Sequence, residues 1–308
     1  MKELMALLNN TNTIVSILAG FFAITAPLLL WYKRRKENKK SDVISQNVAT
    51  RFIAIFESHG VHRNQIPTFF DHGLTFFHCS TDEELLKHLT NDILEAVTEL
   101  FAINMEWLQG ASDEIYPIHD FYKHPQECKD FLNRLKSNNN PLGGYVFSPS
   151  KTKNRDSYDS AIVITEEIGV LNNHAIERLH ILGGWIFNYW RSRAYLTACA
   201  SIALNNDIWL IGKECDGDWL KTFCTGKEIP KYDFDYGGFN FNTSKTWYVD
   251  EFIEQPEKYI NGVSPEQNNF GLHSAISKWL ELEASGYMSI DKYSNRIKIR
   301  TQFENYSI

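Results

Sequence analysis

The chain has 308 residues, of which 43% are hydrophobic and 22% are charged, and its formal net charge is −7. These values are typical of a globular protein and exclude a largely disordered chain. The segment 33–40 carries a net +5, which leaves about −12 for the rest of the chain. The body is therefore a poor electrostatic partner for nucleic acid or anionic lipid.

The first forty residues predict a membrane anchor. No charged side chain lies between Glu3 and Lys33, and the 19 residues of the run 14–32 are almost wholly apolar. As a helix this run would be ~28 Å long, close to the hydrocarbon thickness of a bilayer. Trp31 and Tyr32 end the run, where aromatic side chains gather at a membrane interface.

The charges that follow the apolar run predict its orientation. A signal peptide has its cations before the apolar run, whereas this chain has them after it. The positive-inside rule therefore predicts a single-pass protein of the inner (cytoplasmic) membrane, with its N-terminus outside and its body in the cytoplasm. There the five cysteines, which form no CxxC pair, are expected to be reduced. The cations of this membrane flank are Lys33, Arg34, Arg35, Lys36, Lys39 and Lys40.

The segment 41–136 predicts a small helical domain. Apolar residues recur there at helical spacing, as in Val48, Phe52, Ile55 and Phe56. Pro67 interrupts the second expected helix, and Ser80 opens a capping box with Glu83 three residues later. The expected helices cover 46–58, 62–70, 80–89, 91–102 and 105–110.

A linker is expected at 137–144, because three Asn, one Pro and two Gly in a short stretch sustain neither a helix nor a strand. Beyond it, strands and helices are mixed without a regular βαβ alternation, which predicts an α+β domain over 145–308. The expected strands are 145–147, 161–164, 208–211, 247–249 and 297–299, and the expected helices are 173–204 and 272–284.

The string 91–110 resembles the closing two helices of the Cro/C1-type helix-turn-helix family. In that family an aliphatic pair ends one helix, a bend follows, and a short helix with a large apolar residue and a Leu precedes a Gly. The matching residues here are Leu100, Phe101, Ile103, Trp107, Leu108 and Gly110. The resemblance implies a DNA-binding or adaptor module.

The segment His62, Arg63, Asn64 and Gln65 holds the candidate contacts with nucleic acid or a partner, because Arg, Asn and Gln can pair with base edges. The charge of this module disfavours duplex reading. Residues 46–117 contain three cations and eleven carboxylates, whereas a duplex reader needs several cations on the phosphates. Direct DNA binding and an adaptor role both remain open.

The layout of anchor, helix-turn-helix-like module and α+β body resembles the accessory proteins of bacterial retron anti-phage defence systems. That resemblance implies a reverse transcriptase with its RNA–DNA hybrid as partner, and a toxic or growth-arresting output on infection. The alternatives are a membrane-tethered one-component transcription regulator and a membrane-bound enzyme of unknown chemistry. A homo-oligomer is also compatible with this layout.

No phosphate-loop, dinucleotide, hydrolase or metalloprotease motif occurs in the sequence. We therefore expect a protein that is not an enzyme and that binds no cofactor or metal. One acid/base set keeps the enzyme alternative open, because carboxylates and imidazoles exchange protons near neutral pH. It consists of Glu166, Glu167, His174 and His180.

Overall fold

The structure is a computed structural model that describes residues 47–150, 159–233, 238–241, 243–264, 271–288 and 295–306. Residues 48–308 form one compact unit. The expected anchor at 14–32 and its basic flank at 33–40 lie outside the described residues. Within the described part of the chain, no helix is both long and apolar enough to cross a membrane.

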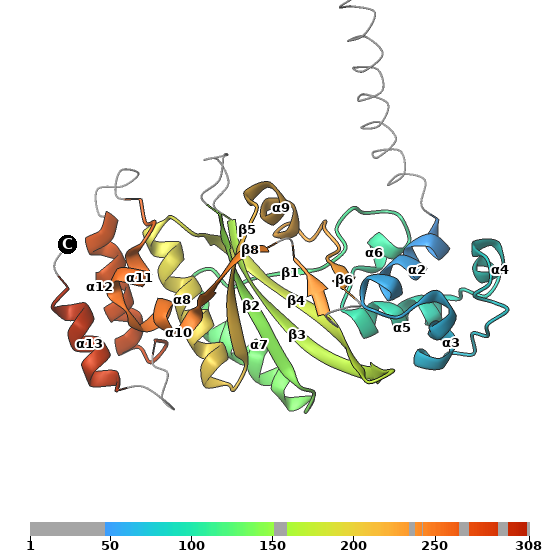
Figure 1. Ribbon diagram of the computed structural model, residues 1–308, viewed down its shortest axis with the longest axis horizontal. Coiled ribbons are helices and arrows are strands. Elements are labelled where there is room, and N and C mark those ends of the chain that lie inside the picture. Colours follow the sequence, from blue (N-terminus) through green and yellow to red (C-terminus); the bar gives the residue numbers. More distant parts are fainter. Residues whose placement is uncertain are drawn as a thin grey trace, which may run out of the picture. The chain divides into compact units, whose positions relative to one another are not determined.

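The α+β class predicted from the sequence is confirmed by a six-stranded mixed sheet with helices around it (Figure 1). The strand order is β1-β4-β3-β2-β5-β8. The strands β2, β3 and β4 form an antiparallel meander, β5 runs parallel to β2, and β1 runs parallel to β4. The bounds are β1 Ile118–Asp120, β2 Leu142–Pro149, β3 Asp159–Leu171, β4 His174–Ile186, β5 Trp209–Cys215 and β8 Thr243–Tyr248; β6 (Lys231–Asp233) and β7 (Gly238–Asn240) pair separately.

One face of the sheet packs against α7 (Pro125–Ser137) and α8 (Trp190–Asn205). Val146, Ile164 and Leu182 point into this core together with Leu132 and Leu196 of the two helices. Behind α8 lie α10 (Val249–Glu254), α11 (Pro256–Ile260), α12 (Gly271–Ala284) and α13 (Arg296–Glu304).

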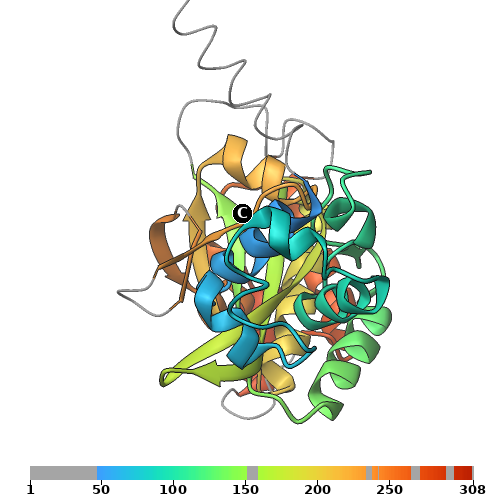
Figure 2. The same ribbon diagram turned by 90° about the vertical axis from the view of Figure 1, so that its right-hand side faces the viewer.

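The opposite face of the sheet shares its core with the helical region of residues 48–108 and with α9 (Gly217–Phe223). Phe56, Phe101 and Trp107 of the helical region belong to the same buried cluster as Val163 and Leu179 of the sheet. Figure 2, which faces the helical region, shows the hairpin of β3 and β4 beside it. The helices are α2 Val48–Ser58, η1 Arg63–Gln65, α3 Ile66–Phe69, α4 Asp82–Leu86, α5 Asn91–Phe101 and α6 Met105–Leu108.

Elements that precede the expected linker at 137–144 already belong to the sheet and its core. The strand β1 pairs with β4, and α7 packs on α8, although both precede residue 138. Residues 142–144 begin β2, so the prediction that this stretch is not a strand is wrong. Glycine is needed there because a Cβ on Gly144 would lie 2.3 Å from the carbonyl oxygen of Val163 on the neighbouring strand.

Three other predictions about secondary structure are wrong. The expected helix 173–204 is β4 followed by α8, because β4 is buried on both faces and therefore lacks the alternation that marks a half-buried strand. The expected strand 297–299 lies in α13, where Asn295 caps the first turn by accepting a hydrogen bond from the backbone N–H of Lys298 (3.1 Å). The cap of α4 is Thr81 rather than Ser80.

Candidate functional site

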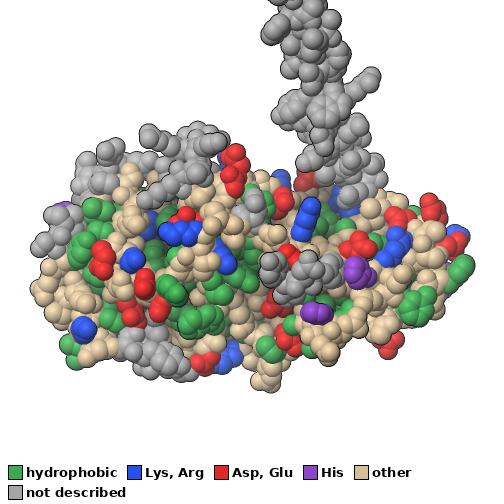
Figure 3. Space-filling model, in the orientation of Figure 1, with side chains coloured by type: hydrophobic (Ala, Val, Ile, Leu, Met, Phe, Trp, Pro, Cys, Tyr) green, Lys and Arg blue, Asp and Glu red, His purple; other side chains and the backbone are tan. Residues whose placement is uncertain are grey.

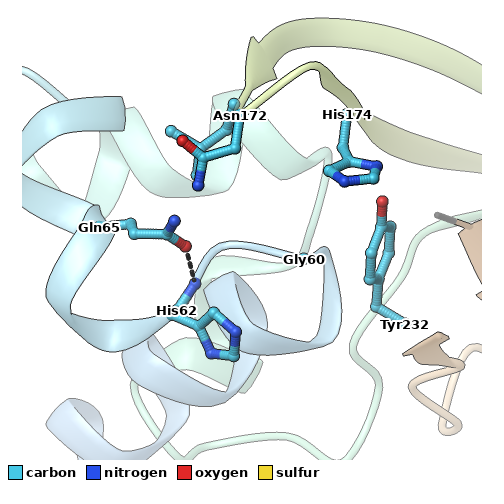
Figure 4. Close-up of a pocket in the computed structure, with 7 residues that line it drawn as sticks. Gly60, His62, Gln65, Asn172, His174 and Tyr232 are labelled. Carbon is cyan, nitrogen blue, oxygen red and sulfur yellow. Dashed lines mark hydrogen bonds between the residues drawn. The ribbon is translucent and has the colours of Figure 1, made fainter. Parts of the chain in front are cut away.

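A cavity of about 260 Å³ lies where the helical region meets the tip of the β3–β4 hairpin (Figure 4). Figure 4 shows side chains that converge from three separate segments of the chain, with the Tyr232 hydroxyl directed toward His174. The lining residues are Gly60, His62, Gln65, Leu171, Asn172, His174 and Tyr232.

The helical side of the cavity is fixed by the turn after α2. Gly60 has a φ of 88°, which only glycine adopts without strain, and the backbone N–H of Val61 then bonds back to the Phe56 carbonyl (2.9 Å). The Gln65 Oε1 accepts a hydrogen bond from the backbone N–H of His62 (3.0 Å). His62 and Gln65 are therefore held on one tight turn that borders the cavity.

Tyr232 covers this turn with its ring. A Cβ added to Gly60 would lie 2.9 Å from ring carbons of Tyr232, so the ring rests directly on the glycine backbone. Glycine at position 60 thus serves both the left-handed turn and the wall of the cavity.

The hairpin side of the cavity is fixed by a two-residue turn. Asn172 and Asn173 both have positive φ values, 51° and 66°, as a type I′ turn requires. The register pairs Leu171 with His174 at the end of the ladder. The hairpin lies close to α3, because a Cβ on Gly169 would be 2.9 Å from the Phe69 ring.

None of the described residues that line the cavity carries a formal charge at neutral pH with histidine neutral. Their amide, imidazole and phenol groups both donate and accept hydrogen bonds. Burial and the charge of Glu177 together raise the pKa of Tyr232. Burial also raises the pKa of Glu177 itself. Such a lining suits a small, polar, uncharged group.

The structure separates the four candidate contact residues. His62 and Gln65 line the cavity, and Asn64 is exposed beside it. Arg63 is engaged within the fold, because its Nε donates to the Cys79 carbonyl (2.5 Å) and its guanidinium pairs with Asp82 (2.8 Å).

The helix-turn-helix signature residues form the core of the helical region. Phe101, Ile103, Trp107 and Leu108 are buried, Leu100 packs against that core, and Gly110 has a φ of 86°. Between α3 and α4, the described residues 70–81 form turns and bends and contain no helix. The helix α4 that follows has five residues.

The acid/base set is divided between two places. Glu166 is fully buried and accepts hydrogen bonds from Arg178 Nε, His180 Nε2 and Asn140 Nδ2, each at 2.8 Å, and from Asn138 Nδ2 at 3.1 Å. His174 lies in the cavity instead. Among the described residues, no group of three His, Cys, Asp or Glu side chains is arranged to hold a metal ion.

His59 lies directly before the cavity turn and is fully buried, with its Nδ1 donating to the Ile55 carbonyl (2.7 Å) and its ring against Phe101 (4.6 Å between centroids). Burial lowers its pKa from 6.5 to about 4, although the hydrogen bond to Ile55 opposes this shift. The unfolded chain therefore binds a proton between pH 6.5 and 4 that the folded chain does not bind.

We expect the free energy of unfolding to fall as the pH drops through this window, by about 3 kcal/mol in total from this residue. Urea unfolding of the detergent-solubilised protein at pH 7 and pH 4.5 measures the loss. His59→Gln, which cannot titrate, should flatten the pH dependence, while His124→Gln at an exposed position should not. An unchanged slope in His59→Gln would contradict the assignment.

No family model matches the chain, and neither a curated protein nor a solved structure shows significant similarity to it. Of the cavity residues on the hairpin and on β6, the sequence analysis selected His174 only as part of the acid/base set, and it did not select Asn172 or Tyr232. The Asn172–Asn173 pair between two apolar runs was the available signal, since such pairs favour two-residue hairpin turns. No pattern in the sequence marked Tyr232.

Proposed function

We propose that this chain is a membrane-anchored adaptor of a retron-like antiviral system, and that it receives its signal at the cavity between the helical region and the β3–β4 hairpin. The observation that carries the proposal is the lining itself. Segments around residues 62, 172 and 232 converge on one cavity with neutral groups that donate and accept hydrogen bonds. The expected anchor and the helix-turn-helix-like string support the membrane and adaptor parts of the proposal.

An adaptor role accounts for the helical region better than binding to double-stranded DNA does. The one arginine of the candidate segment is bound to Asp82 and to the Cys79 carbonyl. The described residues between α3 and α4 offer no helix that could enter a major groove. The region also carries eight more carboxylates than cations over 46–117, which opposes contact with phosphates.

The cavity suits one unpaired base or a similar small polar group. Gln65 and Asn172 present amides that can pair with a base edge, and the rings of His62, His174 and Tyr232 supply stacking surfaces. A volume of about 260 Å³ is slightly below the range typical of pockets for drug-sized ligands. A reverse transcriptase with its RNA–DNA hybrid is the partner that this layout fits.

Affinity capture of the full-length protein in mild detergent, with protein and nucleic acid in the eluate both identified, tests the proposal. Recovery of a reverse transcriptase with a bound RNA–DNA hybrid supports the adaptor function. Recovery of duplex promoter DNA alone would instead support the one-component regulator, and recovery of neither would direct attention to the enzyme alternative.

The variant Gln65→Glu tests whether the partner binds at the cavity. The substitution keeps the size of the side chain and the oxygen that accepts from the His62 N–H, but it places a negative charge in the cavity and removes the amide donor. We expect the captured partner to be lost or reduced at least about tenfold, because partner binding would bury the new charge, and burying an unpaired charge costs more than about 1.4 kcal/mol. Gln109→Glu, at an exposed amide of the same region, should capture the partner normally.

One observation favours the enzyme as a second candidate. Glu177, whose pKa is raised by burial, acts electrostatically on both Tyr145 and Tyr232, and perturbed titratable groups beside a cavity are typical of catalytic sites. A Glu177→Gln variant that still captures its partner but loses the cellular output would support this candidate over a pure adaptor.

A further inference from the structure

Two neighbouring aromatic side chains of the helical region are exposed to solvent. Phe76 is 64% exposed and Phe77 is 67% exposed, and Leu86 nearby in the sequence is 42% exposed. Figure 3 shows hydrophobic side chains on the surface at the end of the helical region. Large apolar side chains that gather on a surface commonly mark a contact with a partner or a membrane.

The turn that carries these rings is ordered by its own hydrogen bonds. The backbone N–H of Cys79 bonds to the Thr75 carbonyl (3.1 Å), and that of Ser80 bonds to the Phe77 carbonyl (3.0 Å). Arg63 also donates a hydrogen bond from its Nε to the Cys79 carbonyl oxygen. Leu74 and Cys79 are buried on either side of the two rings. The fold therefore holds Phe76 and Phe77 outward.

The start of α4, which follows this turn, contacts the first turn of α2, where the N-terminal part of the chain joins the helical region. The Thr50 hydroxyl, in the first turn of α2, donates to the Asp82 carboxylate (2.7 Å) at the start of α4. Fifteen residues, 33–47, separate the apolar run from Val48. They span about 22 Å as a helix and at most about 50 Å when extended. A chain anchored through the run 14–32 would therefore keep residues 76–86 within reach of the lipid headgroups.

The charges around the patch do not prevent contact with lipid. Asp82 pairs with Arg63 (2.8 Å), and Glu84 pairs with Lys87 (2.6 Å), so these two carboxylates are neutralised locally, while Glu83 is exposed and can remain in the aqueous layer. The attraction that remains is apolar, and aromatic and aliphatic side chains partition into the boundary between headgroups and acyl chains.

We propose that Phe76, Phe77 and Leu86 insert into the headgroup boundary of the membrane that holds the anchor, as a second point of contact. This inference rests on the proposed anchor and goes beyond it, because a tether alone leaves the helical region free to rotate. Two points of contact would fix which side of the helical region faces the cytoplasm.

The full-length protein in nanodiscs of zwitterionic phosphatidylcholine provides the test, with an environment-sensitive fluorophore attached at Phe77→Cys. The native thiols interfere little, because Cys79, Cys128, Cys199 and Cys215 are buried and Cys224 is half-buried; labelled wild-type protein gives the background. Ile297→Cys, at a residue that is 79% exposed on α13, is the matched control.

At position 77 we expect a blue-shifted emission that doxyl-labelled lipids quench, and at position 297 a solvent-like emission that they do not quench. A second labelled variant, Leu86→Cys, should behave as position 77 does. A blue shift without quenching by lipid means that the patch contacts protein, and a solvent-like emission means that it contacts nothing; either result overturns the inference.

Carbonate extraction separates this inference from the anchor. If the chain stays in the membrane fraction and position 77 is not quenched, the anchor stands and the second contact is refuted. If carbonate releases the chain, the anchor fails and the inference fails with it.

Discussion

Replacing Glu166 with alanine is expected to lower the free energy of unfolding by about 3–5 kcal/mol, because one partner of a buried ion pair is then missing. Arg178 and His180 would lose a shared carboxylate oxygen, Oε2, and the amides of Asn138 and Asn140 would lose the other, Oε1. The Arg178 guanidinium also donates to the Glu99 carbonyl of α5 (2.9 Å), so the loss would reach the helical region.

Urea unfolding of the detergent-solubilised protein at pH 7 measures this loss. Glu127→Ala, which removes an exposed Glu–His pair on α7, should cost less than about 1 kcal/mol. A loss below 1 kcal/mol in Glu166→Ala would show that the cluster is not structural.

The contribution of Glu166 and its hydrogen-bond donors to stability should also depend on pH. Burial disfavours the ionised form of Glu166, but the hydrogen bonds from His180, Arg178 and the two asparagines outweigh burial and hold its pKa well below the ordinary 4.5. Its contribution to stability is therefore present above pH 4.5 and is lost as the pH falls below that value. Glu166→Gln should lose this part of the acid sensitivity, which lies at lower pH than the part assigned to His59.

Reversing the charge asymmetry around the run 14–32 is expected to invert the membrane topology. The change replaces the six cations of the flank with asparagine and inserts three lysines after Glu3, so that the positive charge precedes the apolar run. Topology follows the cytoplasmic excess of Lys and Arg near the ends of a span, so the body should then be exported.

Alkaline phosphatase and green fluorescent protein fused after residue 308 report the location of the body, because the first is active only outside the cytoplasm and the second only inside it. Lys227→Asn with Lys231→Asn, which removes cations from the body, should leave the topology unchanged. A body that stays cytoplasmic after the charge reversal would refute the predicted orientation.

The helices that the sequence predicted well have one buried face. The helix α5 follows the stripe Ile93, Leu94, Val97 and Phe101, all of which are buried, and α12 follows the expected helix 272–284 closely. Pro67 proved compatible with α3 because it occupies the first turn, where its missing N–H costs nothing.

The wrong prediction of a helix over 173–204 has a physical cause. In β4, Leu179 and Ile181 face the helical region while Leu182 faces α7 and α8, so apolar residues occur on both sides of the strand. The apolar residues of β4 are therefore spaced in the sequence like the apolar face of a helix. The positive φ of Gly184 is incompatible with that helix and fits the observed strand, where a side chain would collide with Asp120.

Half of the candidate site followed from the sequence. His62 and Gln65 were selected for their hydrogen-bonding chemistry, and both line the cavity. His174 was selected for a different role, in the acid/base set, and Asn172 and Tyr232 were not selected, because the cavity exists only when the hairpin tip and β6 lie against the turn at Gly60. That arrangement depends on a shared core whose members are more than one hundred residues apart.

The pairing of β1 with β4 also constrains how the protein is made. The partner of Ile118 is Ile181, and the core of the helical region includes Phe223 and Phe241. At about 5–20 residues per second, a ribosome needs roughly 6–24 s to pass from the end of β1 to Phe241. During that interval the helical region has left the ribosome without the sheet that completes its core. The nascent chain therefore exposes apolar surface, and its synthesis should depend on chaperones more than that of a helical domain with a self-contained core.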